Sequence, residues 1–306
     1  MPELPEVETI VSDLNKIILG LTIRDIWYDW KKQFKLPKDP REFKKIVVGK
    51  KIVGVRRRAK NILIDLSGGY LLLVHQKMTG HLLVGKWSIR KAQPSPAARG
   101  IRKRPSEYKV VSLIKGAFQE KVNNYIHLIF YLSDDSQLAL SDLRKFAKVM
   151  VGKKEKIEKL PDLADLGPEP LDKNFDIPRF RNLIREKTRA IKRVLMDQNV
   201  IAGIGNIYSD EILWKAKIFP LRKADKLSAE ELGKIFRAMK TILKKAVRLR
   251  GASTSDFRDP AGREGRYTFQ RLVYRREGEP CPRCRTAIKR IKMEGRSAHY
   301  CPKCQT

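Results

Sequence analysis

The last 26 residues contain all four cysteines of the chain, arranged as two pairs with two residues between the members of each pair. Cys281 and Cys284 form the first pair and Cys301 and Cys304 the second, with sixteen residues between the pairs. Each pair can present two thiolates to one ion, and two pairs complete a tetrahedral four-thiolate site of the kind that binds zinc. We therefore expect one structural Zn2+ and, between the pairs, a basic hairpin that contacts nucleic acid.

The N-terminus offers a second reactive group. A small residue at position two, here Pro2, permits removal of Met1 and leaves a prolyl secondary amine. A terminal amine has a pKa near 8, so roughly 10% of it is neutral at pH 7. A neutral amine can attack C1′ of a sugar and form an iminium ion, with Glu3 beside it as an acid. Many proteins begin with Met-Pro, so this pattern alone does not indicate catalysis.

The segment Asp197–Asn206 separates two predicted helices. Gly203 and Gly205 allow another part of the backbone to approach closely, and Asn206 can cap the helix that follows. Exposed amides at the start of that helix would form a phosphate-binding site. An ordinary helix–turn–helix corner has the same sequence features, so the segment does not by itself identify a function.

Charge narrows the class of partner. The chain has 66 Lys and Arg residues against 34 Asp and Glu residues, a net charge of +32, which favours a polyanion and salt-dependent binding. A generic RNA-binding protein would show the same balance. The hydrophobic content of 42% argues against disorder. No stretch of apolar residues is long enough for a transmembrane helix, and the start lacks a signal-peptide pattern, so we expect an intracellular, reducing location.

Hydrophobic periodicity predicts the elements that position these groups. The first half is mainly antiparallel β, with a helix at its start and strands joined by tight turns at Gly68–Gly69 and Ser133–Ser136. The second half is helical, with predicted helices at Phe180–Met196, Ile207–Ala216 and Ala229–Leu249. The Pro-, Ser- and Arg-rich stretch between Lys86 and Asn123 is expected to be a mobile loop that adds non-specific DNA affinity.

Several motifs occur together in one order along nearly the whole chain. In that order they resemble the formamidopyrimidine-DNA glycosylase family: Met1–Thr9, Arg57–Lys60, His75 with Met78–Gly80, Leu166–Leu171, Gly203–Tyr208 and the terminal four-cysteine finger. Single motifs in this set are weak, but the ordered set is specific.

The resemblance implies an α+β fold. An N-terminal antiparallel β-sandwich flanked by helices would occupy residues 1–155, and a linker would span 156–172. A helix-two-turn-helix DNA-binding domain would follow over 173–264, with the zinc finger at 265–306. DNA would lie in the cleft between the two larger parts.

The resemblance also implies catalytic roles for four residues. Pro2 would be the Schiff-base nucleophile, and Glu3 the acid that helps to open the sugar ring. Lys60 matches the family's lysine for β-elimination and phosphate binding. Arg296 matches the finger arginine associated with phosphate contact and δ-elimination.

Further positions match DNA-contacting residues of the family. Met78, Arg144 and Phe146 correspond to the side chains that fill the place of an extruded nucleotide and face the orphan cytosine. The other matching positions contact the DNA backbone or lie near such a contact, and they are His75, Asn123, Lys187 and Asn206. Asn123 stands near where relatives carry a DNA-contacting histidine, and Leu143 and Ala147 replace a more usual proline and glycine.

The expected function is therefore a bifunctional DNA glycosylase and AP lyase of base excision repair. It would excise oxidised purines such as 8-oxoguanine and formamidopyrimidines from double-stranded DNA, as a monomer in the bacterial cytoplasm, associated with the nucleoid through DNA. Two alternatives are an endonuclease VIII-like glycosylase for oxidised pyrimidines and a non-catalytic zinc-ribbon protein that binds nucleic acid.

Overall fold

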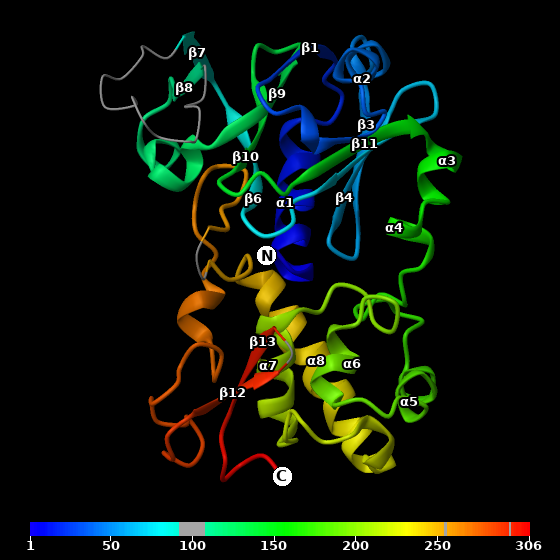
Figure 1. Ribbon diagram of the computed structural model, residues 1–306, viewed down its shortest axis with the longest axis vertical. Coiled ribbons are helices and arrows are strands. Elements are labelled where there is room, and N and C mark those ends of the chain that lie inside the picture. The colour runs from blue at the N-terminus through cyan, green and yellow to red at the C-terminus, as the bar shows by residue number, and fades with distance from the viewer. Residues whose placement is uncertain (92–107, 254–255, 294) are drawn as a thin grey trace.

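The computed structural model describes residues 1–91, 108–253, 256–293 and 295–306. Figure 1 shows two halves, with the β-sheets at one end, the long helices and the C-terminal hairpin at the other, and the N-terminus between them. The predicted α+β architecture is confirmed. No helix in the described ranges is both long and apolar enough to cross a membrane.

Two sheets form the first half. The four-stranded sheet has the order β1-β9-β10-β6, and its strands are Ile23–Tyr28, Ile126–Leu132, Gln137–Asp142 and Gly80–Gly85. The five-stranded sheet has the order β2-β11-β5-β4-β3, and its strands are Phe34–Leu36, Lys148–Lys153, Tyr70–His75, Asn61–Leu66 and Ile52–Arg58. All neighbouring strands are antiparallel except β2 and β11.

Strand β4 contributes side chains to two apolar cores, one on each face of the sheet. Side chains alternate along a strand, so a continuous apolar run buries both faces of a sheet. Ile62 and Ile64 face the core shared by the two sheets and by helix α1 (Leu4–Ile17). Leu63 faces the other side, where it packs against a second apolar cluster that includes Ile157 and Leu163.

Part of the segment predicted as a linker, residues 156–172, is helical. The segment 156–172 begins inside α3 (Lys154–Glu158) and contains α4 (Pro161–Ala164), and both helices contribute to the cluster on the outer face of the five-stranded sheet. The short helix α2 (Pro40–Val47) covers the sheet domain elsewhere, and its N-cap Asp39 accepts from the backbone N–H of Arg41.

The second half contains four helices, packed on their own apolar core. They are α5 (Ile177–Arg185), α6 (Ile191–Met196), α7 (Asn206–Ala216) and α8 (Ala229–Arg248). The single helix predicted over Phe180–Met196 is wrong, because the chain breaks between α5 and α6. Ala190 there bridges to Lys223, and the first amides of α6 donate to the carbonyls of the 220–222 loop instead of to a preceding turn.

The basic stretch after Lys86 is only partly described. Its flanks pair as an antiparallel hairpin of β7 (Trp87–Lys91) and β8 (Tyr108–Ser112), followed by two 3-10 turns at Gly116–Gln119 and Lys121–Asn124. The prediction of a loop is wrong for these flanks. Residues 92–107, which contain the Pro-, Ser- and Arg-rich centre, lie outside the described residues.

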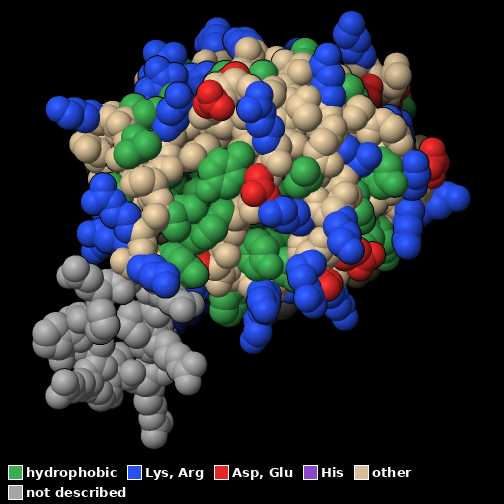
Figure 2. Space-filling view, turned by 90° about the horizontal axis from the view of Figure 1, so that it is seen from above, with side chains coloured by type: hydrophobic (Ala, Val, Ile, Leu, Met, Phe, Trp, Pro, Cys, Tyr) green, Lys and Arg blue, Asp and Glu red, His purple; other side chains and the backbone are tan. Residues whose placement is uncertain are grey.

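The C-terminal hairpin consists of β12 (Lys289–Met293) and β13 (Arg296–Tyr300), as the cysteine spacing predicted. It packs beside α7. Positive charge is not confined to this side of the protein. Figure 2 shows Lys and Arg side chains around much of the rim of the opposite, sheet-domain end. Charge alone therefore does not locate a DNA-binding surface.

Candidate active site and DNA-binding surface

A cavity of about 530 Å³ lies where the N-terminus meets the helical half. It brings together residues from the N-terminus, the β3–β4 turn, the two loops of the sheet domain, the start of α7 and the finger hairpin. Six of the residues singled out from the sequence line it: Glu3, Lys60, Met78, Arg144, Asn206 and Arg296. Pro2 is buried between two lining residues, Met1 and Glu3.

Glu3 joins the two halves of the protein. Its carboxylate accepts the backbone N–H of Gly205 at 2.7 Å and of Ile207 at 2.8 Å, so it caps helix α7 from outside. A Cβ at position 205 would lie 2.5 Å from the Glu3 carboxyl carbon, so only glycine fits there. Two expectations are corrected here. The Glu3 carboxylate binds the amides at the start of α7 that were predicted to bind a phosphate. Asn206 is the first residue of this helix instead of its cap.

A second carboxylate lies behind the first. Glu6 is 1% exposed and accepts the hydroxyl of Tyr208 at 2.5 Å, the N–H of Ala252 at 2.7 Å and the N–H of Glu3 at 2.8 Å. Burial, followed by the charge of Glu3, raises the pKa of Glu6 to about 7. Burial lowers the pKa of the Met1 terminal amine, although both carboxylates act in the opposite direction. An amine at the buried N-terminus is therefore more often neutral than one in solvent.

Lys60 reaches the cavity from the turn between β3 and β4. Its ammonium donates to the carbonyl of Ile204 at 2.8 Å, and burial lowers its pKa to about 8. The turn is fixed by Glu169, whose carboxylate accepts the N–H of Ala59 and a guanidinium N–H of Arg57, both at 2.6 Å. These bonds hold Ala59 at a φ of 53°, which an alanine rarely adopts. A lysine of this kind can switch between a charged and a neutral form near physiological pH.

Arg296 begins strand β13 and is exposed at the cavity wall. A second depression of about 510 Å³ continues from this wall over the finger hairpin. Its cationic lining residues are Arg275, Arg290, Lys292 and Arg296. Asn206 lies where the two depressions meet, and no described residue hydrogen bonds to its buried Oδ1. The surface is suited to a strand of phosphates that passes the cavity.

Met78, Arg144 and Phe146 come from two loops of the sheet domain that Asp142 ties together. The Asp142 carboxylate accepts the N–H of Phe146 at 2.6 Å and of Ala147 at 2.7 Å, and it bonds the hydroxyl of Thr79. Phe146 is 51% exposed, and the Arg144 guanidinium rests 4.5 Å from the centre of its ring. The backbone is fixed while these side chains project outward.

Three further candidates do not line the cavity. The Nδ1 of His75 accepts the N–H of Lys77 at 3.0 Å, and burial lowers the pKa of His75 to about 3, so the imidazole is neutral. Lys187 lies in the turn after α5. Asn123 is fully buried, where its side chain bonds His81 at 2.9 Å and donates to Ala117 at 2.7 Å. In this structure Asn123 has no surface left for a direct DNA contact.

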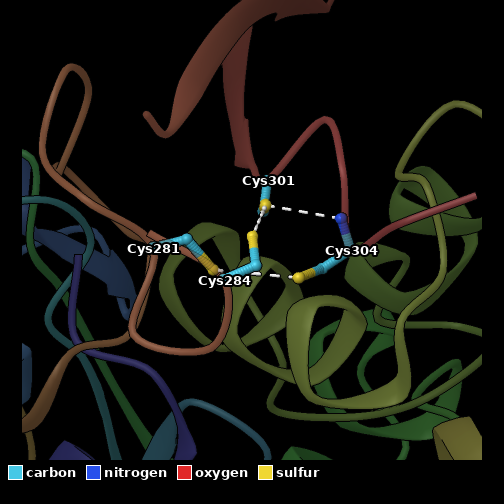
Figure 3. A group of neighbouring side chains, drawn as sticks. All are labelled: Cys281, Cys284, Cys301 and Cys304. Atoms are coloured by element: carbon cyan, nitrogen blue, oxygen red, sulfur yellow. Dashed lines mark hydrogen bonds between the residues drawn. The ribbon is translucent and has the colours of Figure 1, made fainter. Parts of the chain in front are cut away.

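The four cysteines gather at the base of the finger hairpin, with their sulfur atoms pointing toward one another (Figure 3). Their ligand atoms all lie within 4.8 Å of one another, and the pairs Cys281–Cys304 and Cys284–Cys301 are 4.0 and 3.4 Å apart. Tetrahedral zinc with bonds of about 2.3 Å needs sulfurs about 3.8 Å apart. The cluster fits one structural zinc ion.

Sequence reasoning missed the buried carboxylates that hold these parts in place. Asp142, Asp210 and Glu211 are each no more than 2% exposed, and none belongs to a motif with a chemical signature of its own. Glu211 accepts the N–H groups of Leu272, Val273 and Tyr274, which fixes the loop that leads to the finger. An acidic residue inside an otherwise apolar helix such as α7 was the one available signal, because buried carboxylates need partners.

Three family models match consecutive parts of the chain. The formamidopyrimidine-DNA glycosylase N-terminal domain matches residues 1–149, and the H2TH domain of the same family matches residues 166–258. A zinc finger found in FPG and IleRS matches residues 278–306.

Curated relatives match over their whole length. The formamidopyrimidine-DNA glycosylase of Pelotomaculum thermopropionicum is 37% identical over 305 residues, which cover 100% of this chain and 99% of the relative. The same enzyme of Listeria innocua is 34% identical, with 100% of both chains covered.

Solved structures agree with these relatives. The crystal structure of the Fpg protein of Thermus thermophilus matches with a TM-score of 0.80 and 32% identity, over 99% of this chain and 98% of that one. A Lactococcus lactis Fpg complex with Fapy-dG-containing DNA matches with a TM-score of 0.81 and 30% identity, over 99% and 100%. Another complex of that protein, with the same TM-score and identity and 100% of both chains covered, contains an oxidised pyrimidine in its DNA.

Proposed function

The chain belongs to the formamidopyrimidine-DNA glycosylase family, and from that premise we propose how its residues perform base excision. It is a DNA glycosylase of base excision repair with a structural zinc finger, and AP lyase activity is part of the family's chemistry. One observation carries the residue-level proposal: Met1, which directly precedes Pro2, lines a single cavity together with Glu3, Lys60 and Arg296.

The first step uses the amine of Pro2, freed by removal of Met1. Its nitrogen lone pair forms a bond to C1′, and the damaged base leaves with the electron pair of the glycosidic bond and a proton from the Glu3 carboxyl. The Glu3 carboxylate then takes the proton of the nitrogen, whose lone pair forms the iminium while the bond from C1′ to O4′ breaks. Glu3 passes that proton to O4′ as the ring opens. The hydrogen bonds from α7 hold the Glu3 carboxyl beside the amine during this step.

The iminium withdraws electrons from the sugar and makes the C2′ proton acidic. Loss of that proton expels the 3′-phosphate, and a second elimination expels the 5′-phosphate. Lys60 lines the cavity, where it can take the proton or bind a phosphate, and its lowered pKa favours the first of these roles. Arg296, which also lines the cavity, is proposed to bind the departing phosphate.

The exposed loops are proposed to open the duplex. Met78 and Phe146 would replace the stacking that an extruded nucleotide gives up, and Arg144 would face the orphan base. Asn206, Lys187 and His75 would contact the backbone, with His75 acting as a neutral group. For Asn123 the burial described above supports a role in holding His81, instead of the contact expected from its position.

We propose oxidised purines, namely 8-oxoguanine and formamidopyrimidines, as the main substrates, in double-stranded DNA and with the protein acting as a monomer. Support comes from the relatives' name and from the Lactococcus lactis complex with a Fapy-dG lesion. A preference for oxidised pyrimidines is the second candidate, because a relative of the same family is seen with such a lesion. A bacterial cytoplasmic location follows from this function.

Borohydride trapping tests the proposal. Borohydride should reduce the iminium and leave the protein covalently attached to 8-oxoguanine-containing DNA through residue 2, as mass spectrometry of the linked peptide would show. Pro2→Gly keeps a terminal amine and should retain some trapping, whereas Pro2→Leu, which retains Met1, should lose it. Attachment at Lys60 would reject the nucleophile assignment, and absence of any trapped species would favour a non-catalytic binding protein.

A further inference from the structure

A buried ion pair lies beneath the finger hairpin, outside the groups that the proposed chemistry uses. The ammonium of Lys192 on α6 is 2.7 Å from a carboxylate oxygen of Asp210 on α7, and the two side chains are 1% and 0% exposed. Burial lowers the pKa of Lys192, and Asp210 acts against this shift. Removal of either partner would leave the other charged and unpaired in the interior, so the pair has a strongly determined geometry.

Both members of the pair also bind strand β13. The other carboxylate oxygen of Asp210 accepts the backbone N–H of His299 at 3.0 Å and lies 3.1 Å from its ring Nδ1. Lys192 donates to the carbonyl of Ser297 at 2.5 Å. The backbone of the strand is therefore held at Ser297 and at His299, one and three residues after Arg296.

The zinc ligands lie far from the tip of the hairpin, so the Lys192–Asp210 pair provides a second point of attachment. Cys301, at the base of the hairpin, follows the last residue of β13, whereas Arg296 lies at the tip, five residues earlier. A strand rises about 3.3 Å per residue, so the tip is roughly 16 Å from the metal ligand. Zinc alone would leave the hairpin free to pivot about its base. Lys192 fixes it next to the tip, at Ser297, and Asp210 fixes it midway along the strand, at His299.

We propose that Lys192 and Asp210 are positioning residues that hold Arg296 against the cavity wall and so set how often β-elimination is followed by δ-elimination. This inference rests on the proposed role of Arg296 at the departing phosphate. Helix α7 then orients both walls of the cavity, because its N-terminus binds Glu3 and its second turn binds the finger strand.

The ratio of the δ-elimination product to the β-elimination product at a pre-formed abasic site tests the inference. A misplaced Arg296 would lower this ratio, whereas a general loss of structure would lower both products. Asp210→Asn keeps the shape of the side chain but removes its charge. The δ-product should fall about tenfold relative to the β-product, since a displacement of about 1 Å at a reacting group has effects of this size or larger. Base release from 8-oxoguanine DNA should change less, within about threefold. Lys192→Arg, which keeps the charge, should retain a higher ratio of δ- to β-product than Lys192→Gln.

Glu279→Gln is the matched control, because it breaks an exposed ion pair with Arg276 within the finger without touching β13. Its ratio should equal that of the wild type. Zinc content should be one ion per chain in every variant. An unchanged ratio in Asp210→Asn and Lys192→Gln, or an equal fall of both products with zinc retained, would overturn the inference. A wild-type protein that forms neither product would instead reject the proposed lyase function.

Discussion

The proposed catalytic corner and the proposed duplex-facing loop position their side chains in opposite ways. In the corner, formed by Glu3, Glu6 and Lys60, the charged side chains are buried and bonded to protein groups. In the loop from Asp142 to Phe146, one buried carboxylate holds the backbone, and the side chains of Arg144 and Phe146 remain exposed.

The buried corner and the exposed loop differ because the first is proposed to bind a reacting sugar and the second a DNA duplex. A reacting sugar needs acids and amines that are oriented before it arrives, because reorientation during the reaction adds to the barrier. A duplex presents a variable base opposite the lesion, so the loop benefits from side chains that can move on a fixed backbone. The expected effects of substitutions are therefore larger and more specific in the corner than in the loop.

Glu3→Gln should give the largest effect. An amide cannot supply a proton, and general acid catalysis contributes on the order of 10³-fold. Base release from 8-oxoguanine DNA should fall by about that factor in single-turnover assays. Cleavage of a pre-formed abasic site should fall much less, since no base has to leave. Glu42→Gln, at an exposed position of α2, is the control. Equal losses of both activities would mean that Glu3 only docks α7.

Asp142→Ala tests whether a fixed backbone matters in the loop. It removes the acceptor of several backbone N–H groups, each of which costs about 1–3 kcal/mol when left unsatisfied. We expect binding of duplex DNA with a tetrahydrofuran abasic analogue to weaken about 30-fold, which corresponds to roughly 2 kcal/mol. Affinity for undamaged duplex, measured in parallel, should change little. An unaltered dissociation constant for the analogue would show that the loop orders itself without Asp142.

Arg144→Ala leaves that backbone intact and removes one projecting side chain. Hydrogen bonds from a guanidinium to a base are worth about 1–3 kcal/mol of discrimination. The preference for cytosine over adenine opposite the lesion should fall about tenfold, as ratios of kcat/KM would show, with base release opposite cytosine only mildly affected. Phe146→Ala provides the contrast, because it removes the ring on which the guanidinium rests but not the hydrogen-bonding group. If the preference survives in Arg144→Ala, another residue recognises the orphan base.

The pH profile of Lys60 should give the smallest effect. Its pKa near 8 means that the ammonium form dominates below pH 8 and the neutral amine above it. If the neutral amine takes the C2′ proton, β-elimination at a pre-formed abasic site should rise about eightfold from pH 7 to 8.5. Lys60→Arg should lack this rise, because a guanidinium stays charged over the whole range. A profile shared by both proteins would restrict Lys60 to phosphate binding.

Local patterns in the sequence were sufficient for most of the sheet domain and for the zinc cluster. Runs of β-branched and aliphatic residues predicted β4 and β5 with their Gly68–Gly69 turn, and the cysteine spacing predicted the hairpin of β12 and β13. In both cases the determining interactions lie between residues close in sequence. The ordered family motifs also selected six residues that line one cavity, although no single motif indicated their proximity.

The remaining features depend on partners that are distant in sequence. Glu3 caps a helix that begins about 200 residues later. No local signal in the sequence shows that the amides of this helix bind a carboxylate of the protein instead of a phosphate. The break after α5 depends on the 220–222 loop, and the burial of Asn123 depends on His81. Lys192 and Asp210 resembled ordinary surface charges because an ion pair is visible only after the helices have packed.

The contact between Glu3 and the start of α7 also couples the position of the acid to the assembly of the two halves. A free prolyl amine reacts with aldehydes in general, including those of sugars and metabolites. Here the acid that accompanies the amine is held in place by a helix from the other half of the protein. A chain that is incompletely folded, truncated or cut between the halves retains the amine but loses the acid's orientation. Release of a damaged base therefore depends on assembly of the two halves, because only then is the Glu3 carboxyl held beside the N-terminus.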